Sequence, residues 1–306
     1  MPHGWIILDK PLGLGSTQAV AAVKRNLREA GLGKVKVGHG GTLDPLATGV
    51  LPIALGEATK LAGRMLDASK VYEFTVAFGA ETDTLDLEGK VVRHSSLPCA
   101  RDLWAAISAH IGPIEQQPPA YSAIKVEGQR AYDLARAGND VDLPSRQVTI
   151  YDLLSTNRLG NRSGDQLVGE ADLRAHVSKG TYIRSLARDL ALHAGSVGHV
   201  TKLRRVRAGP FTIVQAISLD KLNAVGKGAP LERVLLPLEA GLVDIPALDL
   251  SPQQAGLVRQ GRVLTGLPQH DGLFWARSGS NPVALVELSG GDARVVRGFN
   301  LPDVAE

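Results

Sequence analysis

A single carboxylate follows a glycine-rich turn near the start of the chain, in the stretch VGHGGTLDPLATG at residues 37–49. Asp44 stands directly before Pro45, and His39 lies earlier in the same stretch. A carboxylate at the end of such a loop could act on a substrate as a nucleophile or a general base. An Asp-Pro step also begins many turns, because the aspartate hydrogen-bonds nearby backbone and proline fixes its own φ. The stretch alone leaves both interpretations open.

Motifs of other common chemistries do not accompany this loop. The segment KPLGLGST at 10–17 superficially matches a phosphate-binding P-loop, but it lacks the lysine before Ser16 that would reach the phosphates. The eight histidines show no metal-ligand spacing, and no GxSxG nucleophile elbow occurs. The single Cys99 excludes an intramolecular disulfide and a cysteine-based zinc cluster. We therefore expect no metal and no cofactor.

Positive charge is concentrated in two segments, although the net charge of the 306 residues is only +3. Residues 174–207 hold eight basic side chains against Asp189 alone, and residues 24–36 hold five against Glu29. One such run is commonly a solvated helix face, whereas two in a nearly neutral chain favour a polyanionic partner. No basic-then-apolar leader and no apolar run of bilayer length is present, so we expect a soluble cytoplasmic protein.

Apolar periodicity predicts the elements that would position the loop. Buried strands are predicted at 4–9 and 50–55, and residues 71–78 alternate with Tyr72 and Phe74 on one face. Ser16 is a candidate cap for a helix that ends near Gly31. Further strands are predicted at 91–93, 147–154 and 173–178, and further helices at 57–66, 100–110, 128–137 and 181–194. This mixture predicts an α/β (α+β) fold.

Two segments depart from this pattern. A polar excursion punctuated by proline and glycine runs from about 113 to 146 and reads as a thumb-like insertion or a surface loop. From about residue 245 the chain changes to short strands and glycine turns, which predicts a small β-rich module over 245–306. We therefore expect a domain at 1–244, which contains the Asp44 loop, followed by this module.

Blocks across residues 5–211 resemble the TruB family of tRNA pseudouridine synthases, in the family's order. They are ILDKP at 7–11, GHGGTLDPLATGVLPIALGEATK at 38–60, YEFTVAFGAETDTLDLEG at 72–89, PPAYSAIKVEGQRAYDLARAG at 118–138, SRQVTIYDL at 145–153, VSKGTYIRSLARDL at 177–190 and HVTKLRRVRAGPF at 199–211. The uninterrupted PLATGVLPIALGEATK is similar to the stand-alone bacterial branch. Gly40 departs from the family pattern, where we expect threonine or another small residue, and would add backbone freedom.

The resemblance implies isomerisation of uridine 55 in the TΨC arm of tRNA, which needs one carboxylate and neither a metal nor a redox cofactor. It assigns that carboxylate to Asp44 and its orienting cation to Arg184. Tyr72 matches the residue that stacks on the flipped base, although periodicity alone would place Tyr72 in the core. Tyr182 and Leu203 match residues that line the uracil pocket.

The remaining matched residues concern RNA contact and support. His39 matches a histidine that meets the opened RNA loop, and Lys10 is expected to support the catalytic loop or to lie near RNA. Asp83 and Asp86 are expected to organise a turn. Phosphate contacts are expected from four further basic residues, Lys179, Lys202, Arg204 and Arg205.

The resemblance also implies an architecture and a set of partners. We expect a catalytic domain built on a mixed, mainly antiparallel sheet, followed by a PUA-like RNA-binding module. The expected partner is the T arm of tRNA, bound by a monomer that needs neither a guide RNA nor a protein partner and contacts no membrane. The alternative is a tRNA-binding or tRNA-folding protein of the same family that has lost the chemistry.

Overall fold

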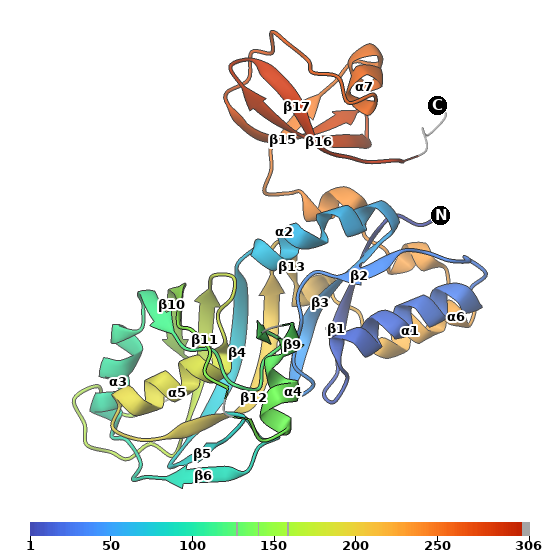
Figure 1. The fold of residues 1–306 in the computed structure, drawn as a ribbon. Helices are drawn as coiled ribbons and strands as arrows, with labels where there is room; N and C mark the ends of the chain where they lie inside the picture. The colour runs from blue at the N-terminus through green and yellow to red at the C-terminus, as the bar shows by residue number, and fades with distance from the viewer. Residues whose placement is uncertain (127, 140, 158, 302–306) are drawn as a thin grey trace.

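A nine-stranded sheet forms the centre of the chain in the computed structural model, which describes residues 1–126, 128–139, 141–157 and 159–301 (Figure 1). Its main path is β1 (Gly4–Lys10), β3 (Ala47–Leu55), β12 (Gly198–Ala208), β4 (Lys70–Phe78), β11 (Glu170–Val177), β10 (Arg146–Ser155) and β7 (Gly112–Gln116). The short strands β2 (Val37–His39) and β13 (Phe211–Thr212) pair with β3 and β12. Only β3 and β12 run parallel among these pairs. The prediction of a mixed, mainly antiparallel sheet is confirmed.

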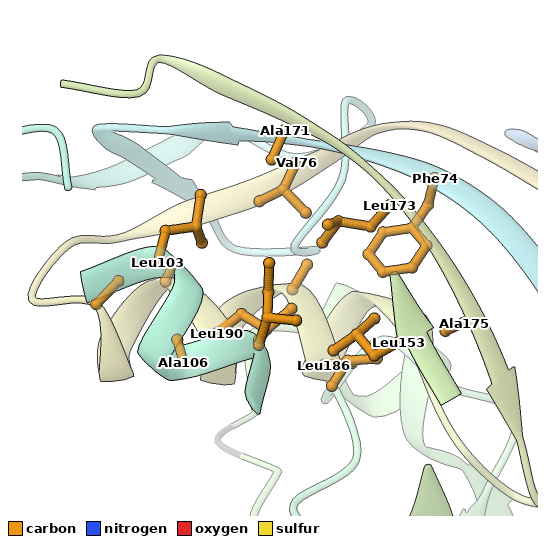
Figure 2. Close-up of a cluster of buried hydrophobic side chains, with 14 of the residues drawn as sticks. Phe74, Val76, Leu103, Ala106, Leu153, Ala171, Leu173, Ala175, Leu186 and Leu190 are labelled. Atoms are coloured by element: carbon orange, nitrogen blue, oxygen red, sulfur yellow. The ribbon is translucent and has the colours of Figure 1, made fainter. Parts of the chain in front are cut away.

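Two helices cover one face of the sheet at β4, β11 and β10. They are α3 (Ala100–Ala109) and α5 (Ile183–His193), and their apolar sides meet the strands in a single core (Figure 2). Leu186 and Leu190 of α5 and Leu103 of α3 are fully buried there against Val76 of β4. The helical spacing of these leucines explains why 100–110 and 181–194 were correctly predicted as helices.

The other half of the sheet packs against α1 (Ser16–Glu29) and α6 (Leu219–Gly226). After β3 the chain forms the 3₁₀ helix η1 (Gly56–Leu61) and then α2 (Ala62–Asp67), where one helix was predicted at 57–66. Leu61 and Met65 of this segment are buried, but Leu66 is 51% exposed. Three short 3₁₀ helices lie further along the chain, η2 (Ile213–Gln215), η3 (Leu231–Arg233) and η4 (Leu238–Gly241).

A thumb segment, residues 117–145, leaves the sheet after β7 and returns at the start of β10. It contains a two-stranded hairpin, β8 (Lys125–Val126) with β9 (Gln129–Arg130), and the short helix α4 (Ala131–Arg136). The helix predicted at 128–137 was therefore too long, because its first residues pair as a strand. A second small hairpin, β5 (Ala80–Thr82) with β6 (Val91–His94), projects from the end of β4.

The C-terminal module is a four-stranded sheet with one helix. The sheet follows the order β14 (Ala247–Asp249), β15 (Gly272–Ser278), β16 (Asn281–Ser289) and β17 (Asp292–Gly298), and α7 (Pro252–Arg259) packs on it. Leu285 and Phe299 of the module share a second core with Trp5 and Phe211 of the central sheet. Residues 302–306 of the predicted module lie outside the described residues. None of the described helices is long and apolar enough to cross a membrane.

Candidate active site

The loop that presents Asp44 connects β2 to β3 and is fixed by buried polar groups from two other elements. The Ser16 hydroxyl, at the start of α1, donates to the Leu43 carbonyl at 2.9 Å and accepts from the Leu43 amide at 2.8 Å. Lys10 at the end of β1 is fully buried, and its Nζ donates to the Pro45 carbonyl at 3.2 Å. Lys10 therefore supports the loop and does not contact solvent.

The two interpretations of the Asp-Pro step are compatible, because they concern different atoms of Asp44. Its main-chain carbonyl accepts a hydrogen bond from the Ala47 amide at 3.0 Å, which closes a turn around Pro45. Its carboxylate stays outside that turn, with the side chain 40% exposed. The backbone forms the turn, and the turn presents the side chain.

Arg205 was predicted to contact phosphate, but its side chain is instead buried beneath the Asp44 loop and holds that loop. The residue is 1% exposed. Its guanidinium donates to the carbonyls of Gly41 and Thr42, each at 3.2 Å, and to the Val50 carbonyl at 2.8 Å. A side chain buried among main-chain carbonyls stabilises the loop and cannot reach an RNA backbone.

Gly40 has a packing role that was not predicted from the sequence. A Cβ at this position would lie 2.5 Å from Cβ of Met65, which is buried in α2. The Gly40 amide also donates to the Pro52 carbonyl at 2.8 Å. The missing side chain lets α2 pack directly on the loop.

Arg184 is the cation that orients Asp44. Its side chain is 6% exposed, and Nη2 lies 2.9 Å from Oδ2 of Asp44. The same guanidinium donates to the carbonyls of Thr84 at 2.8 Å and Tyr121 at 2.9 Å. Because the thumb carries Tyr121, this arginine joins the thumb, the turn after β5 and the Asp44 loop at a single point.

A second carboxylate, Asp86, stands behind this pair. Its Oδ2 lies 3.6 Å from Nη1 of Arg184, and its Oδ1 accepts from the Thr84 hydroxyl at 2.6 Å and from the Glu88 amide at 3.0 Å. Asp86 therefore organises a turn, as predicted, and also positions Arg184. The prediction missed the second role.

A cavity of about 300 Å³ opens beside the Asp44 carboxylate. It is lined by Tyr72 of β4, Leu203 of β12 and Tyr182 at the start of α5, together with Asp44 and Arg184. Tyr72 also packs against the cores on both sides, so it is both a core residue and part of the cavity wall. The volume and the aromatic lining suit a planar ring the size of a nucleobase. Among the described residues, no group of three or more potential metal ligands occurs.

Comparison with protein families decides which family carries this arrangement. Residues 28–183 match the TruB family pseudouridylate synthase N-terminal domain, and residues 184–243 match the tRNA pseudouridylate synthase B C-terminal domain. The chain belongs to the TruB family. Membership in this family implies isomerisation of uridine in tRNA.

Individual TruB-family proteins match the chain over nearly its whole length. It is 71% identical to a tRNA pseudouridine synthase B of Novosphingobium aromaticivorans over the full length of both chains. A tRNA pseudouridine synthase B of Zymomonas mobilis is 56% identical, over 97% of this chain and 96% of that protein. The similarity therefore covers the Asp44 loop, the thumb and the C-terminal module together.

Solved structures confirm the TruB-family fold. A crystal structure of a Cbf5-Nop10-Gar1 complex contains a chain that is 26% identical, with a TM-score of 0.71 over 98% of this chain and 85% of that one. A structure of an H/ACA RNP bound to a substrate RNA containing 2'-deoxyuridine contains a chain with the same TM-score and 24% identity, and it covers the two chains to the same extent. These likenesses extend over the central sheet and the C-terminal module.

In this TruB-family chain His39 lines a second cavity, which adjoins the pocket that Tyr72 lines and shares Asp44 and Arg184 with it. This cavity of about 630 Å³ extends from the Asp44 loop to the thumb, where Tyr132 and Arg136 line it. Burial, and to a lesser degree the charge of Arg205, lowers the pKa of His39. Its Nδ1 is buried without a hydrogen-bond partner among the described residues. A neutral imidazole here suits stacking or hydrogen bonding to a base better than it suits pairing with phosphate.

The other three residues predicted to contact phosphate differ in their solvent exposure and in the ion pairs that they already form. Lys202 is exposed on β12, and Lys179 is exposed but pairs with Asp67 at 2.8 Å. Arg204 is partly exposed and forms two hydrogen bonds with Asp9, at 3.0 and 2.8 Å. Lys179 and Lys202 remain the most accessible of the predicted set.

Two further residues around the pocket were not predicted from the sequence. Gln116 of β7 is fully buried, and its side-chain amide accepts from the Tyr182 amide at 2.8 Å and donates to the Tyr182 carbonyl at 3.1 Å. Arg146, the first residue of β10, lies over the Tyr182 ring with its Cζ 4.6 Å from the ring centroid. Arg146 occurs within a block of the family resemblance and Gln116 lies just before one, but the roles of both depend on contacts with a distant tyrosine.

Proposed function

We propose that this protein converts uridine 55 in the T arm of tRNA to pseudouridine. The observation that carries the proposal is the Asp44 carboxylate, held at 2.9 Å by the buried Arg184 beside a cavity walled by Tyr72 and Tyr182. A carboxylate that is partly exposed and firmly oriented is the one reactive group that this isomerisation requires.

The reaction is balanced without any external reagent. The N1–C1′ bond breaks, the uracil turns, and a C5–C1′ bond forms. The proton lost from C5 is offset by one gained at N1, so the product is an isomer of the substrate. Asp44 serves as the nucleophile or as the base toward the sugar, and Arg184 fixes the direction of its attack. Tyr72 offers its ring to the uracil while the base is detached.

Access to the uridine requires that it leave the folded T arm. Flipping one nucleotide costs a few kcal/mol of stacking and pairing, which contacts to the rest of the arm must offset. We assign the opened loop to the cavity between the Asp44 loop and the thumb, which His39 lines. We assign Lys179 and Lys202 as the cations that contact the phosphates of this RNA loop.

We further propose that the chain acts alone, as a monomer in the cytoplasm, without a guide RNA or a protein partner. The PUA-like C-terminal module would add a second RNA-binding surface beyond the catalytic domain. The structural relatives in RNA–protein particles share the fold, and we assign none of their partners to this chain.

Mapping the modified position tests the proposal against a tRNA-binding protein without activity. The protein is incubated with an unmodified tRNA transcript, with an isolated T-arm stem-loop and with a transcript that carries cytidine at position 55. We expect one pseudouridine in the first two RNAs and none in the third. Binding without modification of any RNA would favour the inactive binding protein, and modification outside the T arm would overturn the assigned position.

A further inference from the structure

The cavity beside Asp44 holds more positive charge than a uracil ring would require. Four cationic side chains line it against the single carboxylate of Asp44, namely Lys70, Arg146, Arg184 and Arg205. Uracil is neutral, whereas every nucleotide of RNA also carries a negative phosphate. The surplus charge therefore points to a ligand group other than the base.

Three of the four cations are already committed to partners within the protein. Arg184 holds Asp44 and two carbonyls, and Arg205 donates to three carbonyls of the loop and β3. Lys70 is buried, and its Nζ donates to the carbonyls of Leu66 and Ala68, each at 2.6 Å. None of these three can turn toward a new anion without abandoning a hydrogen bond in the interior.

Arg146 differs from the other three. Its guanidinium lies over the Tyr182 ring, and among the described residues it forms no hydrogen bond and no ion pair. Its Nε is buried without a partner among the described residues, as is the Nε of Arg184, but both terminal nitrogens of Arg184 are engaged. A guanidinium has five N–H donors, and leaving a buried donor unpaired costs free energy, so a ligand that accepts from this edge would be favoured.

The position of Arg146 is fixed by its strand partner Gln116 and by the ring of Tyr182. As the first residue of β10 it pairs in the sheet with Gln116 of β7. Gln116 in turn holds the main chain of Tyr182 through both the oxygen and the nitrogen of its side-chain amide. A guanidinium that lies over an aromatic face can still donate from its edge, and its planar fork of N–H groups suits a two-pronged contact.

We propose that Arg146 binds the phosphodiester group adjacent to the flipped uridine through its guanidinium edge. When a nucleotide rotates out of the stack, the neighbouring phosphate moves with it toward the mouth of the pocket. Arg146 then anchors the backbone while Asp44 acts on the sugar and the base. This inference rests on the proposed function, because it concerns the same pocket and the same RNA.

A comparison of variants and phosphate analogues tests the inference. Single-turnover rates and RNA affinity are measured for the wild type, Arg146→Gln and Arg146→Lys with T-arm stem-loops. In two analogues of the stem-loop, a neutral methylphosphonate replaces the phosphate on either the 5′ or the 3′ side of the target uridine. Arg162→Gln is the matched control, because Arg162 lies over the Trp104 ring at 4.4 Å and does not line the pocket. Thermal melting of each variant verifies that it is folded.

We expect Arg146→Gln to lower the rate or the affinity about 10- to 100-fold with unmodified RNA. We expect the methylphosphonate at one of the two positions to cause a similar loss in the wild type and little further loss in Arg146→Gln. Arg146→Lys should lie between them, because lysine keeps the charge without the planar fork. Arg162→Gln should behave as the wild type.

Additive losses at both phosphate positions would overturn the inference, since they would mean that Arg146 only supports Tyr182 or contacts the base. An unaffected Arg146→Gln would overturn it as well. Either result in an active wild type would leave the proposed function intact. A wild type that forms no pseudouridine would instead contradict the proposed function itself.

Discussion

At the scale of single residues, the guanidinium of Arg184 is shared between two carboxylates and two main-chain carbonyls. Asp44 and Asp86 take the charged contacts, and Thr84 and Tyr121 take the neutral ones. A lysine would keep the charge but would offer only one nitrogen, which cannot serve all these acceptors. Arg184 is therefore a positioning residue for Asp44 as well as a link between three segments.

Arg184→Lys should accordingly lower the single-turnover rate of pseudouridine formation by about 100- to 1,000-fold, the usual effect of losing one oriented electrostatic contact. Arg174→Lys is the control, because Arg174 is exposed on β11 and its contact with Glu73 is long, at 3.9 Å. A rate of Arg184→Lys within a few-fold of the wild type would show that the shared guanidinium geometry is not needed.

The lowered pKa of the buried Lys10 predicts that the free energy of unfolding depends on pH. Burial lowers its pKa from 10.5 to about 8, although the nearby Asp44 opposes the shift. Between about pH 8 and 10.5 the unfolded chain therefore binds the proton that the folded chain has released, so this residue makes the free energy of unfolding rise with pH. The slope from one proton cannot exceed about 1.4 kcal/mol per pH unit.

Urea denaturation of the wild type and Lys10→Met across this pH range measures the effect. We expect the wild-type curve to rise relative to that of the methionine variant between pH 8 and 10.5 and to run parallel to it below pH 7. The buried Lys70, whose pKa is also lowered to about 8, contributes equally to both proteins. Parallel curves throughout would contradict the shift at Lys10.

At the scale of elements, Gln116 connects the base of the thumb to the start of α5. Replacing it with leucine would leave the amide and carbonyl of Tyr182 without their side-chain partner in a buried position. We expect Gln116→Leu to lower the free energy of unfolding by about 1–3 kcal/mol and to slow pseudouridine formation, because Tyr182 lines the pocket.

The neighbouring residue provides a matched control for this prediction. Gln117 is exposed, and among the described residues its side chain donates only to Asp142, at 3.0 Å. Gln117→Leu should change the free energy of unfolding by less than about 0.5 kcal/mol. Equal effects of the two substitutions, measured by urea denaturation, would show that the contact between Gln116 and Tyr182 does not contribute to the free energy of unfolding.

The same elements show how far the sequence could predict the site. Long periodic segments such as α1, α5 and β4 were predicted because their apolar spacing directly reflects which face is buried. The Asp44 loop and Arg184 were predicted from the family motifs. The contact of Asp86 with Arg184 and the roles of Gln116 and Arg146 were missed, because each depends on a partner distant in the chain, which local patterns do not encode.

Arg204 and Arg205 illustrate the limit most clearly. Adjacent residues of a strand point to opposite faces, so at most one of them could enter the interior. Register shifts in the pairing of β12 with β4, between Val200 and Lys202 and between Arg205 and Arg207, change which face each residue takes. The sequence alone could not identify Arg205 as the buried member of the pair. Leu66 is another such case, since it is 51% exposed and lines the pocket, although leucine is usually buried.

At the scale of the whole molecule, the C-terminal module is joined to the central sheet by a shared apolar core as well as by the chain. Phe299 is 3% exposed and packs in the cluster that includes Trp5 and Phe211. Two polar contacts flank it, from Lys60 Nζ to the Gly298 carbonyl at 2.8 Å and from the Asn300 amide to Glu57 at 2.7 Å. These contacts fix the module against η1.

Phe299→Ala should therefore release the module without unfolding it. We expect limited proteolysis to cut this variant in the connection near residues 242–246 and to leave a resistant module. Phe274→Ala is the matched control, because Phe274 is equally buried but lies in the module's own core. That variant should lose the module itself to the protease, since truncating a buried phenylalanine costs about 3–5 kcal/mol. Identical digestion patterns would contradict the shared core.

The central claim is that Asp44 performs the chemistry on a tRNA that the rest of the molecule binds. Asp44→Asn keeps the size of the side chain and removes its negative charge, and Asp152→Asn makes the same change at an exposed position of β10. Single-turnover mapping of pseudouridine on unmodified tRNA, with RNA affinity measured in parallel, compares both variants with the wild type. We expect Asp44→Asn to bind tRNA but to form no pseudouridine, and Asp152→Asn to match the wild type. Pseudouridine formation by Asp44→Asn would contradict the account.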